Sequence, residues 1–255
     1  MDWSAPIDLY CERTDASFWA EPANALTNAA FLIAAATAFW LWRRQSGSHR
    51  SRDWPALALI VVVVAVGLGS FAFHTLATRG AVLADVIPIA VFIYGYLLLA
   101  LRRFLGVAAG VAVAIVVAYA AGAQALSWLA PPGALNGSVG YLPALVALIV
   151  VARAAHGQAR RGLELAAMIF TVSLALRTID LKACDTFPLG THFAWHLLNA
   201  LVLYVLLRTA IKGAGAENAE SIRSSTPSVV SSPGLTGRSS NHRPGDTGLP
   251  GQAGQ

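Results

Sequence analysis

The sequence predicts an all-α membrane protein, a bundle of seven transmembrane helices. Of its 255 residues, 56% are hydrophobic and only 12% are charged, whereas a soluble domain carries about 25% charged residues. The apolar residues gather in seven long runs, most of them close to the ~20 residues that a helix needs to cross a bilayer. Short polar or basic segments separate the runs. We therefore expect the chain to cross a membrane seven times.

The expected spans follow one another with short connections. They run Asn24–Trp42, Trp54–Ala77, Val82–Leu101, Phe104–Leu126, Val139–Ala155, Leu163–Leu181 and Pro188–Ile211. Residues 1–23 form an extracytoplasmic segment ahead of this 24–212 domain. The remainder, 213–255, is rich in Ser, Gly and Pro from residue 221 onward, a composition that predicts a disordered tail.

Basic residues set the expected orientation, because Lys and Arg concentrate in cytoplasmic loops. The first, third and fifth connections and the end of the last span are basic, whereas the other three connections hold only Arg79 and Lys182. This pattern places the N-terminus outside and the C-terminus in the cytoplasm. It also explains the net charge of +5. Since no basic stripe is interleaved with aromatic residues, a nucleic-acid partner is not expected.

Three histidines and one aspartate stand inside or at the ends of apolar runs, where an ionisable side chain is costly unless it is paired. His192 and His196 are four residues apart at the start of the last span and share one helical face. His74 lies near the end of the second span and Asp85 at the start of the third. By the expected topology all four lie toward the outer side. Three imidazoles with an open fourth position form the ligand set of a catalytic zinc site.

The chemistry follows from these residue types. Zinc lowers the pKa of a water at its open position to about 7. Asp85 is expected to accept the proton of that water and to pass it to the leaving group. Ser70, one turn before His74, is placed to hydrogen-bond the developing oxyanion. The predicted reaction is metal-assisted hydrolysis of an acyl bond within the membrane.

Alternative interpretations of the same residues stay open. Asp85 is also a suitable cap for the start of the third span. Ser70, His74 and Asp85 could form a catalytic triad, although this would leave His192 and His196 without a purpose. The zinc site is therefore the favoured interpretation.

Further polar residues are expected at the outer side. The two cysteines, Cys11 and Cys184, both fall there, and this favours a disulfide. Arg177 and Asp180, three residues apart, predict a structural ion pair or else a contact with a substrate head group. Acidic residues are dense in the first segment, but they lack EF-hand spacing, so their chemistry alone favours a solvated polar segment over a calcium site.

Taken together, these residues resemble the alkaline ceramidases, within the superfamily of seven-helix membrane hydrolases that includes the adiponectin-receptor-like proteins. The motifs that match occur in the family's order between residues 8 and about 210: Y-C-E, A-E-P-x-N-x-x-T-N, G-x-G-S-x-x-F-H, D-x-x-P, R-x-x-D, a lone cysteine and H-x-x-W-H. The resemblance implies zinc bound by His74, His192 and His196, with Ser70 and Asp85 in the roles given above.

The resemblance implies two further features near the N-terminus. One is a disulfide between Cys11 and Cys184. The other is a calcium ion, and its expected ligands are Asp8, Tyr10, Glu12, Thr14 and Glu21.

The expected protein is a zinc-dependent amidohydrolase that cleaves the N-acyl bond of ceramide or a ceramide-like membrane lipid, giving a fatty acid and a sphingoid base. The Ala-rich composition and short loops indicate a bacterial member, in the inner membrane with its active site toward the periplasm. Two other functions stay open: a zinc-containing seven-helix receptor or sensor, and a hydrolase of a non-sphingoid acylated lipid.

Overall fold

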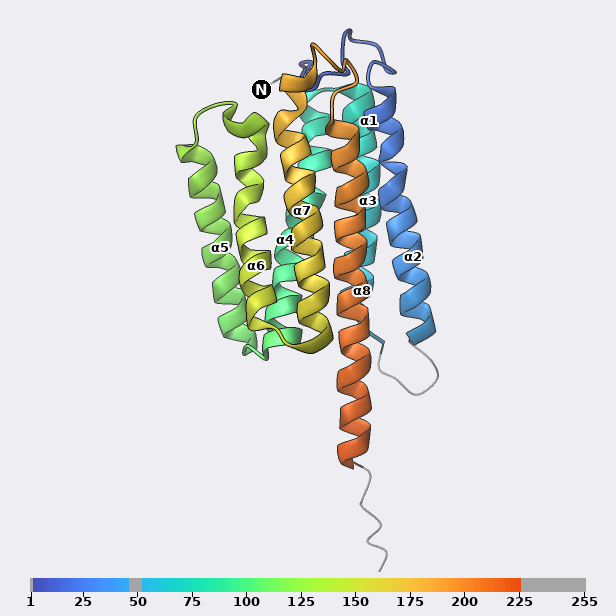
Figure 1. Ribbon diagram of the computed structural model, residues 1–255, viewed down its shortest axis with the longest axis vertical. Coiled ribbons are helices and arrows are strands. Elements are labelled where there is room, and N and C mark those ends of the chain that lie inside the picture. The colour runs from blue at the N-terminus through green and yellow to red at the C-terminus, as the bar shows by residue number, and fades with distance from the viewer. Residues whose placement is uncertain (1, 46–51, 226–255) are drawn as a thin grey trace, which may run out of the picture.

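The computed structural model describes residues 2–45 and 52–225. Within these ranges the chain forms helices and loops but no β-strand. Seven helical segments are long and apolar enough to cross a membrane, which confirms the predicted seven-helix membrane fold. Figure 1 shows the long helices lying side by side, with the N-terminal segment over one end of the bundle.

The spans are built from nine helical elements of the described chain. The first span is α1 (Pro22–Thr27) followed by α2 (Ala29–Gln45). Next come α3 (Trp54–Leu76), α4 (Arg79–Leu105) and α5 (Ala109–Leu129). The fifth span begins with the 3-10 helix η1 (Ala134–Tyr141) and continues as α6 (Leu142–Ala154). The last two are α7 (Gly157–Ala183) and α8 (His192–Ser225).

Helix α4 extends beyond the predicted third span at both ends. It begins at Arg79, where the Thr78 side chain accepts a hydrogen bond from the Ala81 amide. Asp85 therefore lies inside the helix, and its interpretation as a cap is wrong. At the other end α4 continues to Leu105, so Phe104 belongs to this helix rather than to the next. The two arginines before Phe104 indicated a loop, yet cations in a last turn stabilise a helix end.

The last helix also exceeds its predicted length. Helix α8 continues to Ser225, past residue 213, where we expected the tail to begin. The rest of the expected tail, 226–255, lies outside the described residues, as do 46–51 of the first basic connection. The division into three segments and the orientation in the membrane stay predictions.

A close contact between α3 and α4 brings two expected site residues together. A methyl group added at Gly69 would overlap the carbonyl oxygen of Ala84. Only glycine lets the two backbones approach this closely, as is common where membrane helices pack. The next residues along the chain are Ser70 and Asp85, so the contact sets these two side chains beside each other.

The N-terminal segment is fastened over the end of the bundle where α3 ends and α8 begins. The Ile7 amide donates to the carbonyl of Ala77 at 2.7 Å. Cys11 and Cys184 form a disulfide with their Cα atoms 5.3 Å apart, which confirms the predicted pairing. Arg13 adds a hydrogen bond to the carbonyl of His74 at 3.0 Å. The segment thus forms a cover over the histidines rather than a solvated leader.

Candidate metal centre

The three predicted histidines converge in the structure. His74 comes from the last turn of α3, and His192 and His196 from the first turns of α8. All three are at most 2% exposed. Their potential ligand atoms lie within 4.8 Å of one another, so one metal ion can contact all three.

A hydrogen bond at one ring nitrogen fixes the free nitrogen of His74 and of His196. His74 Nδ1 lies 2.6 Å from the Glu21 carboxylate, which can only accept. The Thr27 hydroxyl donates to the Ala23 carbonyl at 2.7 Å and lies 3.0 Å from His196 Nδ1, so it can accept from that nitrogen. The first contact places the proton of His74 on Nδ1, and the second is compatible with the same tautomer in His196. In this tautomer Nε2 is the lone-pair atom that a metal requires.

Unsatisfied ring nitrogens show that a metal fits this group. His74 Nε2 and His192 Nδ1 are sealed from solvent and have no hydrogen-bond partner in the described chain. Buried polar atoms without partners are rare and call for an explanation. Three neutral imidazoles suit zinc, copper, iron or nickel, and three histidines with an open position are the catalytic zinc arrangement. The residues present therefore fit a transition metal.

Asp180 positions the first turn of α8. Its Oδ1 atom accepts from the amides of Thr191 at 2.6 Å and His192 at 2.9 Å, and its Oδ2 atom accepts from the Cys11 amide at 3.2 Å. Gly190, with φ at +65°, makes this possible, because a side chain there would overlap Asp180. The predicted Arg177–Asp180 ion pair is wrong, since main-chain amides take the Asp180 oxygens instead.

Arg177 has a different environment from the one expected. Its guanidinium lies 5.4 to 5.7 Å from the ring centres of Tyr10, Tyr141 and Trp195. It donates to the Tyr10 hydroxyl at 2.9 Å, while its Nε is buried without a partner. The guanidinium is held by aromatic faces, and a hydrogen-bond donor stays available beside the histidines.

Ser70 and Asp85 line the same polar cavity as His192 and His196. The Ser70 hydroxyl interacts with the Asp85 carboxylate. Asp85 Oδ1 has no hydrogen-bond partner among the described residues. Because Glu21 holds His74 Nδ1, the arrangement does not favour a triad in which His74 links Ser70 to Asp85.

The structure does not support the expected calcium site. Asp8 and Thr14 are exposed, and the Glu12 carboxylate accepts from the amides of Ala23 at 2.6 Å and Asn24 at 2.8 Å. Among the described residues, these acidic groups do not gather closely enough to share an ion.

The other two expected calcium ligands serve the histidines instead. The ring of Tyr10 stacks on that of His192 with centroids 3.6 Å apart. Glu21 binds His74 and Arg13. Burial raises the pKa of the Glu21 carboxyl, but its hydrogen-bond partners, His74 first, outweigh that effect and hold the pKa below its ordinary value.

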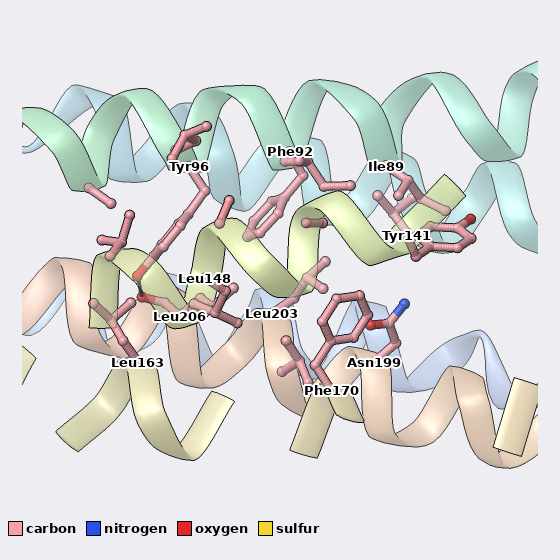
Figure 2. Close-up of a pocket in the computed structure, with 18 of the residues that line it drawn as sticks. Ile89, Phe92, Tyr96, Tyr141, Leu148, Leu163, Phe170, Asn199, Leu203 and Leu206 are labelled. Atoms are coloured by element: carbon pink, nitrogen blue, oxygen red, sulfur yellow. Dashed lines mark hydrogen bonds between the residues drawn. The ribbon is translucent and has the colours of Figure 1, made fainter. Parts of the chain in front are cut away.

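An apolar cavity adjoins the polar one. The two share the lining residues Phe31, Val66, Ile89, Tyr141 and Asn199. Figure 2 shows Tyr141 and Asn199 toward one end of this cavity and Tyr96, Leu163 and Leu206 toward the other. At the end away from Tyr141, the Tyr96 hydroxyl donates to the Leu206 carbonyl at 3.0 Å, so its hydrogen-bond donor is satisfied.

The comparisons with known proteins agree with this geometry. A search of curated proteins finds no matching sequence. The model of the family described as Ceramidase matches residues 4–221, which include most of the N-terminal cover and every span. The chain is therefore a multi-pass membrane protein of the ceramidase family.

Proposed function

We propose that this protein is a zinc-dependent amidohydrolase that cleaves the N-acyl bond of ceramide or a ceramide-like lipid. The observation that carries the proposal is the three-histidine group beside Asp85, whose Oδ1 atom has no partner in the described chain, in a polar cavity that adjoins an apolar one. Membership of the ceramidase family supplies the reaction class, an amide hydrolase acting on a membrane lipid.

His74, His192 and His196 are the residues that would hold the ion. When bound there, zinc supplies an electrophile for the amide carbonyl and lowers the pKa of a water molecule. Asp85 takes a proton from the attacking water and returns it to the departing nitrogen, as a general base and then a general acid. Ser70 donates a hydrogen bond to the carbonyl oxygen as negative charge develops on it.

The apolar cavity accommodates the acyl chain. Its walls are almost entirely aliphatic and aromatic side chains. Tyr141 and Asn199, at one end of it (Figure 2), are among the residues that it shares with the polar cavity. An acyl chain in this space places the amide it carries at the shared mouth, within the same cavity as Ser70 and Asp85. Burial of the chain contributes about 0.8 kcal/mol per methylene, enough to select long acyl groups.

Product analysis tests the proposal. Wild-type protein and Asp85→Asn, purified in detergent and loaded with zinc, are incubated with ceramides, and released fatty acid is measured by mass spectrometry. We expect release by the wild type and a 10²- to 10⁴-fold lower rate for the variant, roughly the range for loss of a general base. A metal-loaded wild type that releases no fatty acid from any N-acyl lipid would contradict the proposal and favour a receptor or sensor.

A second candidate is hydrolysis of a non-sphingoid N-acyl lipid with an anionic head group, such as an acylated amino acid. The observation that favours it is Arg177, which lines the polar cavity and whose buried Nε has no partner in the described chain. Arginine binds carboxylates through paired donors, whereas ceramide carries no anion. An acylated amino acid and a ceramide of equal chain length, compared as substrates, distinguish the two. Arg177→Gln should lower activity on the acylated amino acid alone.

The membrane orientation completes the proposal. Basic connections at the end of the bundle away from the histidines support a cytoplasmic location for that end. The metal centre and its disulfide-linked cover then face the opposite side, which in a bacterial inner membrane is the periplasm. A disulfide at this end agrees with an oxidising compartment.

A further inference from the structure

We infer that the Arg13 guanidinium positions the metal ligand His74 by binding the Glu21 carboxylate between them. Its positive charge takes the place of a calcium ion at Glu21. The inference rests on the proposed metal centre, and it concerns the protein residues behind that centre rather than the reaction. Arg13 is a positioning residue, because it acts through Glu21 and does not line the polar cavity that holds Asp85.

Two buried links connect Arg13 to His74. Arg13 Nε donates to Glu21 Oε1 at 2.5 Å, and Glu21 Oε2 lies 2.6 Å from His74 Nδ1. The three residues are 8%, 2% and 1% exposed, respectively. A carboxylate on the outer nitrogen of a histidine ligand fixes the ring's orientation and tautomer, and loss of such a partner commonly lowers metal affinity about 10- to 100-fold.

The Arg13 guanidinium contacts both the Glu21 carboxylate and the main chain at His74. Arg13 Nη2 donates to the main-chain carbonyl of His74 at 3.0 Å, while Nη1 donates to the carbonyl of Asp15 at 3.1 Å. One rigid, planar group thus fixes the Glu21 carboxylate against the last turn of α3, from which His74 projects. Lysine could not reproduce this fork, because its ammonium is a single point of charge.

The same contacts explain why calcium does not fit. Glu21 uses Oε1 for Arg13, and its Oε2 also accepts from the Asn24 side chain at 3.1 Å. A buried carboxylate is strongly destabilising without a compensating charge. Here that charge comes from the chain, so a divalent cation at Glu21 would have to displace a guanidinium that already carries four hydrogen bonds to the cover and to α3.

The opposing interpretation is that Arg13 only fastens the N-terminal segment. A double-mutant cycle separates the two. If Arg13 acts through Glu21, then once Glu21 is neutralised the removal of Arg13 adds little to the loss of metal affinity. If Arg13 acts only as a fastener, its removal lowers the unfolding temperature but leaves metal affinity unchanged.

The experiment measures zinc affinity of the full-length protein in detergent by competition with a chromophoric chelator. The variants are Arg13→Met, Arg13→Lys, Glu21→Gln and the Arg13→Met/Glu21→Gln pair. Arg160→Met is the matched control, since Arg160 forms an exposed ion pair with Glu164 on α7 and its side chain is 44% exposed. Thermal unfolding of each variant, with and without zinc, is recorded in parallel.

We expect Glu21→Gln and Arg13→Met to weaken zinc binding about 10- to 100-fold, and the pair no more than Glu21→Gln alone. Arg13→Lys should fall between wild type and Arg13→Met, which keeps the test decisive if Arg13→Met does not fold. Wild-type zinc affinity and unfolding temperature should not change between millimolar calcium and a calcium chelator.

Two results would overturn the inference. One is wild-type zinc affinity in both Arg13 variants, or in Arg13→Lys if only that variant folds. The other is a calcium-dependent rise in the unfolding temperature of the wild type. A wild type that binds zinc as expected but hydrolyses no lipid would refute the proposed function and leave this inference standing.

Discussion

Two carboxylates interact with His74, Glu21 in the N-terminal cover and Asp85 in the polar cavity, and their hydrogen bonds differ. On the cover side, Glu21 accepts from Arg13, His74 and Asn24 and is 2% exposed. On the cavity side, Asp85 has an Oδ1 atom with no partner in the described chain and lines the polar cavity. Both oxygens of Glu21 are therefore occupied, whereas Asp85 keeps one oxygen without a partner in the described chain.

Environment, rather than residue type, separates the two carboxylates. A carboxylate whose oxygens are all occupied can orient a ligand but has no capacity left for a substrate. One beside an open cavity can act as base and acid, and pairs of acids in unlike environments commonly divide the work in this way. In the proposed function, Glu21 therefore positions His74, and Asp85 takes part in the reaction.

The largest effect after loss of Asp85 is expected from its neighbour on the cavity side. Ser70→Ala should lower kcat about 10²- to 10³-fold, because it removes a donor to the developing oxyanion. Zinc content and KM should stay close to those of the wild type. Steady-state kinetics on a ceramide, with metal analysis of the same preparation, check this. A loss of metal instead would show that Ser70 supports the metal site, as Glu21 is proposed to do, and would contradict its role in the reaction.

The next effect concerns the cover itself. Cys11→Ser with Cys184→Ser should lower the free energy of unfolding by about 2–5 kcal/mol, because the disulfide joins segments that are far apart in sequence. We expect thermal unfolding to shift down and zinc to dissociate faster from the variant. An unchanged unfolding temperature would show that the hydrogen bonds of the cover suffice without the disulfide.

The smallest effect is expected at the inner end of the apolar cavity. Leu206→Phe, remote from the histidines, should shorten the space and reduce activity on the longest acyl chains about 10-fold, close to the value of one or two methylenes in an apolar pocket. Short-chain substrates should react at nearly the wild-type rate. A uniform loss across all chain lengths would indicate damage to packing rather than a limit on length.

Periodicity and the cost of buried charge predicted the fold and the metal ligands. Seven long apolar runs form helices in a bilayer, because each helix satisfies its own backbone hydrogen bonds. The free-energy cost of burying His74, His192 and His196 there indicated that they share a binding site. The sequence alone could not show that Glu21 contacts His74, because acidic residues are common near an N-terminus. Its contact with His74 depends on how the chain folds back over α3. Arg13 gave no signal, since a lone arginine in a polar segment is usually solvated.

The error over Arg177 and Asp180 has a similar cause. Spacing along one helix face predicted an ion pair, but the loop before α8 returns its own amides to Asp180 through the positive φ of Gly190. Main-chain amides, rather than the Arg177 side chain, bind the Asp180 carboxylate, and their position depends on the path of that loop.

The most direct test of the division between these carboxylates compares the zinc affinity of Asp85→Asn with that of Glu21→Gln, determined on matched preparations. Two carboxylates near one histidine are changed to their amides, so size and shape are preserved in both. We expect wild-type affinity for Asp85→Asn and an affinity about 10- to 100-fold weaker for Glu21→Gln. Equal losses in the two variants, or a loss confined to Asp85→Asn, would contradict the division between a positioning and a reacting carboxylate.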